Sequence, residues 1–216
     1  MSQHTLTLLR FTYKKLKEKL TVSDSKKLFH ERFPYVIPGL FKRIVDEILV
    51  ELNLLNHQNE FNQDYLFCVG LTETFKELMQ GYNPPQHLDL LFESLCNSSN
   101  FEANKIKETS KKSLQEFKNK SLKDVIVLLV EKSGSELYSS RMLNLGIYLI
   151  ISNLEDFVKT KETEKSKIIS DIYEKLNLSV SKAEKDIGIY KSSIKRLQQA
   201  RELIEETKIK DKNKVK

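Results

Sequence analysis

Residues 142–154 read MLNLGIYLIISNL and contain no charged side chain. No longer uncharged run exists in the chain, and a helix that spans a bilayer needs about 20 mostly apolar residues. The stretch therefore predicts no membrane span. Its apolar residues lie nearly all round a helix over residues 137–158, which is typical of a helix at the centre of a bundle. Gly146 costs about 1 kcal/mol relative to alanine there, which indicates a close packing contact.

The composition favours the same fold class. Of 216 residues, 39% are hydrophobic and 31% charged, with only 6 Gly and 4 Pro. Few helix breakers and many Leu, Lys and Glu favour long helices over a loop-rich β fold. The sequence predicts an all-α protein, a single compact helical bundle.

Helical periodicity extends outward from this stretch. Apolar residues recur every three or four positions over residues 41–55, 66–79, 88–96 and 180–197. Pro34 and Pro38 predict a stiff apolar connector that carries Phe33, Tyr35 and Ile37. If this connector is not buried against the body, a partner can dock on it. The run VIVLLV at 125–130 is compatible with a strand, but a lone strand would have no pairing partner, so we predict a helix.

The C-terminal quarter predicts one long helix with coiled-coil character, able to project from the bundle. Its apolar stripe is broken at Arg201 and resumes only at Ile204, and fewer than four clean heptads make a weak independent coiled coil. We divide the chain into a disordered basic extension (1–20), a helical core (21–178) and this helix with its basic tail (179–216). The stripe is the candidate partner-binding surface: Ile187, Tyr190, Ile194 and Leu197.

The net charge of +6 belongs to the two ends of the chain. Residues 1–20 and the last ten residues each carry +4, so everything between sums to −2. This distribution argues against a dedicated nucleic-acid surface. The basic ends can instead favour peripheral contact with an anionic membrane surface. Residues 1–20 lack the apolar centre and cleavage site of a signal peptide.

The sequence offers little catalytic chemistry. The phosphate-binding glycine loops, the GxSxG elbow and the HExxH pair are absent. Asp46, Glu47 and Glu51 are carboxylates on one predicted helix, but Lys42 and Arg43 are placed to pair with the first two. Cys68 and Cys96 sit in apolar contexts that predict two buried thiols. The histidines match no metal-ligand spacing: His4, His30, His57 and His87. We therefore predict no catalytic, cofactor or metal site.

Four segments in order resemble one family. They begin TVSDSKKLFHERFPYVIPGLF, DYLFCVGLTETFKELMQGYNPP, YSSRMLNLGIYLIISNLE and LNLSVSKAEKDIGIYKSSIKRL. Together they are similar to the thylakoid formation protein family over roughly residues 21–158 and 174–213. Residues 1–20 lie outside the likeness.

This resemblance implies an all-helical, non-enzymatic factor of cyanobacteria and plastids. It implies a role in thylakoid membrane biogenesis and photosystem II assembly or repair, through binding of FtsH-type membrane proteases on the cytoplasmic side of the thylakoid. Photosystem II components are further implied partners. Two alternatives stay open: a carrier of pigment or lipid in a groove between helices, and an enzyme whose site is assembled from distant residues.

Overall fold

The computed structural model describes residues 19–133 and 137–214, with side chains described as far as Thr207. Every regular element in these ranges is helical, which confirms the all-α prediction. The elements are α2 (Val22–Arg32), α3 (Gly39–His57), α4 (Tyr65–Leu78), the 3-10 turn η1 (Pro85–His87), α5 (Leu88–Asn97), α6 (Ala103–Phe117), α7 (Leu122–Lys132), α8 (Arg141–Ser152), α9 (Glu155–Lys159), α10 (Glu162–Lys175) and α11 (Val180–Lys214).

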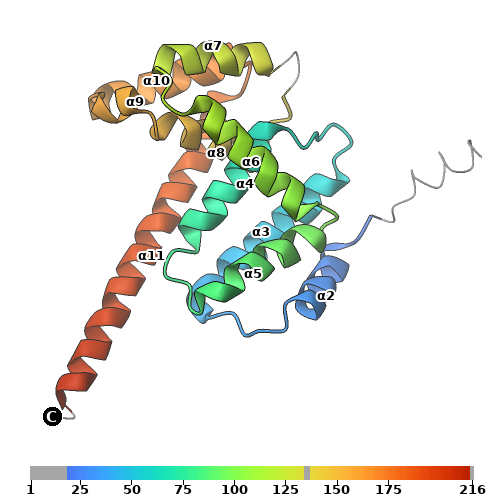
Figure 1. Ribbon diagram of the computed structural model, residues 1–216, viewed down its shortest axis with the longest axis vertical. Helices are drawn as coiled ribbons and strands as arrows, with labels where there is room; N and C mark the ends of the chain where they lie inside the picture. Colours follow the sequence, from blue (N-terminus) through green and yellow to red (C-terminus); the bar gives the residue numbers. More distant parts are fainter. Residues whose placement is uncertain (1–18, 134–136, 215–216) are drawn as a thin grey trace, which may run out of the picture.

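Helix α4 lies between two apolar clusters and contributes to both. Phe67, Cys68 and Leu71 pack into the first cluster, with residues of α2, α3, α5 and α6. Leu66 and Val69 face the second cluster, with residues of α7, α8, α9, α10 and α11. Figure 1 shows the corresponding arrangement, with α3 and α5 on one side of α4 and α7, α9 and α10 gathered at its N-terminal end.

Helices α4 and α8 cross with their backbones in close contact. A Cβ on Gly70 would lie 1.7 Å from the carbonyl oxygen of Met142, and a Cβ on Gly146 would lie 2.0 Å from that of Leu66. Real Cβ atoms do not approach so closely, so only glycine fits at either position. The close packing contact predicted at Gly146 is confirmed, and Gly70 is its partner.

The central helix is shorter than its apolar pattern predicts. Nine of the residues of α8 are buried, as expected for a helix at the centre of the bundle. The helix ends at Ser152, however, and Leu154 is extended before the short α9 begins. The side chains of Ser152 and Asn153 both donate to the carbonyl of Leu149, at 3.3 and 2.9 Å, and so satisfy the last turn locally. The predicted helix 137–158 is therefore wrong at both ends.

The run VIVLLV forms helix α7, as predicted. Ser121 caps it, since its hydroxyl accepts from the amide of Asp124 at 3.2 Å. Only Val125 and Leu129 of the run are buried. The remaining apolar side chains of α7 are partly or fully exposed. The apolar pattern of the run therefore did not distinguish a helix from a strand.

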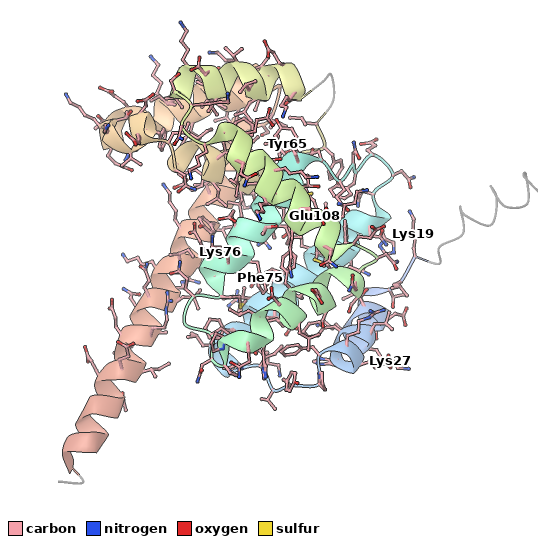
Figure 2. The ribbon with its side chains drawn as sticks, viewed as in Figure 1. Lys19, Lys27, Tyr65, Phe75, Lys76 and Glu108 are labelled. Carbon is pink, nitrogen blue, oxygen red and sulfur yellow. The ribbon has the colours of Figure 1, made fainter. Side chains whose placement is uncertain are left out.

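Helix α11 starts within the bundle and leaves it. Its first half supplies Ala183, Ile187 and Tyr190 to the second cluster, and Leu197 to the first. Its last turns extend away from every other helix in Figure 1. Figure 2 labels Tyr65 and Phe75 near the two ends of α4, the helix that α11 packs against together with α8.

Candidate partner-binding site

The stripe predicted to bind a partner lies inside the folded chain. Ile187, Tyr190 and Leu197 are buried, and Ile194 is partly buried against both clusters. These side chains hold α11 against the body, so a partner would have to displace the helix to reach them. The surface that α11 offers without moving is formed by other residues.

Polar contacts fix α11 to α4 and to the segment before α8. The Tyr190 hydroxyl donates to the carboxylate of Glu77 on α4, and the Lys182 ammonium donates to the carbonyl of Ser139. Burial, and then the Glu77 carboxylate, raise the pKa of Tyr190, so that its hydroxyl keeps the proton it donates. Both contacts join α11 to residues far away in the sequence.

A buried polar network connects α8, α10 and α11. Asn144 Nδ2 donates to Asp186 Oδ2 at 2.8 Å, and the Tyr173 hydroxyl donates to the backbone carbonyl of Asn144 at 2.5 Å. All three side chains are buried. A buried polar group is costly unless it is paired, so this network favours one register of α11 over its neighbours.

A second polar pair joins α3 to the start of α8. Arg141 Nε donates to Glu51 Oε2 at 2.6 Å, and both side chains are largely shielded from solvent. Burial raises the pKa of Glu51, and the adjacent Arg141 guanidinium opposes that rise. Asp186 lies close enough to raise it further. Without Arg141, the pKa of Glu51 would therefore rise further.

Arg201, where the heptad pattern breaks, makes the last hydrogen bond from α11 to the body among the side chains described up to Thr207. Arg201 Nη1 donates to the carbonyl of Gln80 at 2.7 Å. Its aliphatic stem lies over Gly81, whose φ of +77° closes the turn after α4. An arginine thus replaces an apolar residue because the surface it meets is a backbone carbonyl at a turn.

Beyond Arg201 the described side chains are exposed. Leu203 is 64% exposed and Ile204 is 45% exposed, although Ile204 continues the apolar stripe that is buried in the N-terminal half of the helix. Three carboxylates surround this pair, those of Glu202, Glu205 and Glu206. We call residues 202–207 the distal segment of α11; it combines apolar and acidic side chains within two helical turns.

The apolar connector between α2 and α3 is partly buried and partly exposed. Phe33 packs into the first cluster, and Tyr35 stacks on the His87 ring with a centroid separation of 3.8 Å. Ile37 is partly buried against the same cluster, whereas Val36 is 93% exposed. One apolar side chain of the connector therefore stays free for an external contact.

The described residues contain no group of His, Cys, Asp and Glu side chains that could hold a metal ion. Cys68 and Cys96 are buried, as predicted, and burial raises the pKa of each thiol to about 12, so neither is a nucleophile near neutral pH. In the same ranges, no helix has the length and apolarity to cross a bilayer.

The carboxylates of α3 are held in ion pairs. Glu47 pairs with Arg43 at 2.8 Å, as predicted, and Glu51 with Arg141. Asp46 lies 3.8 Å from Lys26 of α2, and not beside Lys42 as the spacing predicted.

Comparison with known proteins identifies the family. The sequence model described as Thylakoid formation protein matches residues 21–216. The chain belongs to the thylakoid formation protein family. Protein Thf1 of Prochlorococcus marinus subsp. pastoris (strain CCMP1986 / NIES-2087 / MED4) is 74% identical over 197 residues, which are 91% of this chain and 98% of that protein. Protein Thf1 of Prochlorococcus marinus (strain MIT 9312) is 72% identical over 199 residues, 92% of this chain and 99% of that protein.

The fold has a solved counterpart. The structure of Psb29 at 1.55 Å superimposes with a TM-score of 0.72 at 24% identity, covering 82% of this chain and 98% of that one. At that identity the likeness establishes the shared helical fold. The family match begins at residue 21, and the predicted N-terminal extension, residues 1–20, falls almost wholly outside the described residues.

Sequence reasoning missed the distal segment and the residues that anchor α11. The return of the stripe at Ile204 was a signal for the first, because an apolar residue in register beyond a break indicates a surface that continues. Asn144 and Asp186 gave no such signal. They are polar residues beside apolar stripes, and only the folded chain brings them together.

Proposed function

We propose that the chain is a non-enzymatic accessory factor for thylakoid membrane biogenesis and for photosystem II assembly or repair. It binds and stabilises FtsH-type membrane protease complexes from the cytoplasmic side of the thylakoid membrane. Membership of the thylakoid formation protein family carries this proposal. The high identity to Thf1 proteins along nearly their whole length supports it.

The architecture supports a binding role. The first half of α11 is fixed to the body by buried apolar side chains and by polar contacts to α4 and α8. The distal segment then presents exposed Leu203 and Ile204 on a preformed helix. Binding of a partner to such a pair costs little conformational entropy, because the helix is already formed before the partner arrives. We propose the distal segment as the protease-docking surface.

Copurification from photosynthetic membranes tests the docking surface. We expect the double substitution Leu203→Ser and Ile204→Ser to reduce the recovered FtsH-type subunits about tenfold or more, since two central apolar contacts are lost. Both side chains are exposed, so the fold should be retained. The helix content of the variant, measured by far-UV circular dichroism, checks this.

Val127→Ser is the matched control. Val127 is an exposed apolar residue on α7, at the other end of the bundle from the distal segment. Its substitution should leave recovery unchanged. Equal recovery with wild type and with the double variant would refute the distal segment as the docking surface, and absence of the protease from all samples would refute the function itself.

A further inference from the structure

A cavity of about 560 Å³ opens between α8, α9, α10 and α11. This volume lies within the range of about 300–1,000 Å³ typical of small-molecule sites. Three of its lining side chains are apolar and buried, those of Phe157, Ile169 and Ile187. Tyr148 forms one wall. The cavity is separate from the distal segment, since α11 borders it only from Glu184 to Lys191.

Gly188 stands at the cavity on α11 and has no packing reason to be glycine. Gly70 and Gly146 are required by backbone contacts, whereas nothing lies within 4 Å of a Cβ built on Gly188. A glycine inside an exposed helix costs about 1 kcal/mol relative to alanine. Because Gly188 has no side chain, there is open space beside the cavity at this position. A ligand could approach the helix backbone there.

Two ammonium groups lie over the aromatic rings of this site. Lys165 Nζ is 5.7 Å from the centroid of Phe157, and Lys191 Nζ is 5.2 Å from that of Tyr148. Glu162 already pairs with Lys165 at 3.0 Å. Among the described residues no carboxylate is within ion-pair distance of Lys191, although Glu162 and Glu184 both line the cavity. Lys191 thus makes no ion pair with a described residue and is the cation left to meet an anionic group, although its charge, after that of Lys165, also lowers the pKa of Glu162.

We propose that this cavity binds a fatty-acid-like amphiphile, a carboxylate head on a single aliphatic tail. The tail lies on Phe157, Ile169 and Ile187 and passes Gly188, and the carboxylate accepts a charge-assisted hydrogen bond from Lys191 Nζ. A ligand with two negative charges is disfavoured, because Glu162 and Glu184 line the same cavity. This site is independent of protease docking by the distal segment.

Calorimetric titration of the full chain with decanoate below its micelle concentration tests the site. We expect saturable binding of one decanoate per chain. Decanol, which has the tail without the charge, should bind about tenfold more weakly, and acetate, which has the head alone, should not bind detectably. An amide shift at residue 188 in nitrogen-15 NMR spectra should accompany decanoate binding.

Two substitutions separate the tail site from the head site. Lys191→Gln should weaken decanoate about tenfold and leave decanol unchanged, because only the charged contact is lost. Gly188→Leu should abolish binding of both, since Gly188 lines the cavity and the added side chain would occupy space at its edge. It should not unfold the chain, because space is open around its Cβ. Lys185→Gln removes an exposed lysine of α11 outside the cavity and should change nothing.

Three results would overturn the proposal. The first is no saturable decanoate binding to the wild-type chain. The second is equal decanoate affinity in wild type and Gly188→Leu, which would place binding elsewhere. The third is the same loss in Lys185→Gln as in Lys191→Gln, which would show only a general attraction to positive charge.

Discussion

Gly70→Ala is expected to lower the free energy of unfolding by about 3 kcal/mol or more, and to lower Tm by about 6–10 °C. The added methyl group would lie 1.7 Å from the Met142 carbonyl oxygen, so α4 and α8 would have to move apart along their whole crossing. That movement loosens both apolar clusters, because α4 contributes to each. Gly146→Ala should behave similarly. The chain has no tryptophan, so urea unfolding is followed by far-UV circular dichroism.

The double variant Gly70→Ala and Gly146→Ala should be less destabilised than the sum of the single variants. One separation of the helices relieves both clashes, and such shared relaxation makes neighbouring substitutions non-additive. Gly188→Ala is the matched control and should raise stability by about 0.5–1 kcal/mol, since alanine is the better helix former and meets nothing. Unchanged stability in Gly70→Ala would contradict the backbone contact at the crossing.

Arg141→Met is expected to lower the free energy of unfolding by about 2–3 kcal/mol at pH 8. The substitution keeps much of the aliphatic volume and removes the cation that pairs with Glu51. Removing one partner of a shielded ion pair leaves the other charge without compensation. Asp186, which already raises the pKa of Glu51, adds to the unfavourable environment.

The destabilisation caused by Arg141→Met should become smaller as the pH falls. Because the pKa of Glu51 is raised in the folded chain, its protonated form is favoured by folding. The stability from this group is fully present below the unfolded pKa, near the ordinary value of 4.5, and is lost as pH rises through the folded pKa. Without Arg141 the folded pKa rises further, so Arg141→Met should differ little from wild type near pH 4.5 and most at pH 8.

Glu51→Gln in the Arg141→Met background supplies the control. A neutral amide carries no uncompensated charge, so the double variant should recover most of the stability lost at pH 8. Urea unfolding at pH 5 and pH 8 measures both effects. A loss that is the same at the two pH values, and that Glu51→Gln does not restore, would show that the charge of Glu51 is irrelevant.

The period of the apolar residues predicted the helices well, because burial on one face imposes that period directly. It located α3, α4, α5 and the buried centre of α8. It failed at the ends of α8, where Ser152 and Asn153 terminate the helix through hydrogen bonds that the apolar pattern does not register. Gly146 was informative before the structure, since a helical glycine needs a reason; its partner Gly70 could not be named.

The candidate site was less predictable than the fold. A stripe such as Ile187, Tyr190, Ile194 and Leu197 shows which side chains share a face, but the same stripe serves an internal contact or an external partner. In the structure the stripe packs against the other helices, whereas Leu203 and Ile204 are exposed. The cavity beside Gly188 joins segments that are distant in the sequence, so no local pattern could indicate it.

The most direct test of the proposed function compares two chains as bait in photosynthetic membrane extracts. One is the full chain, and the other ends after Arg201, the last of the described side chains that hydrogen-bonds from α11 to the body. A shorter chain that ends after Leu176 would lack all of α11 and is less suitable, because it would lose side chains that fill both clusters. We predict that FtsH-type protease subunits copurify with the full chain and are lost about tenfold or more with the shortened one. Equal recovery with both chains would contradict docking by the distal segment, and no recovery with either would contradict protease binding.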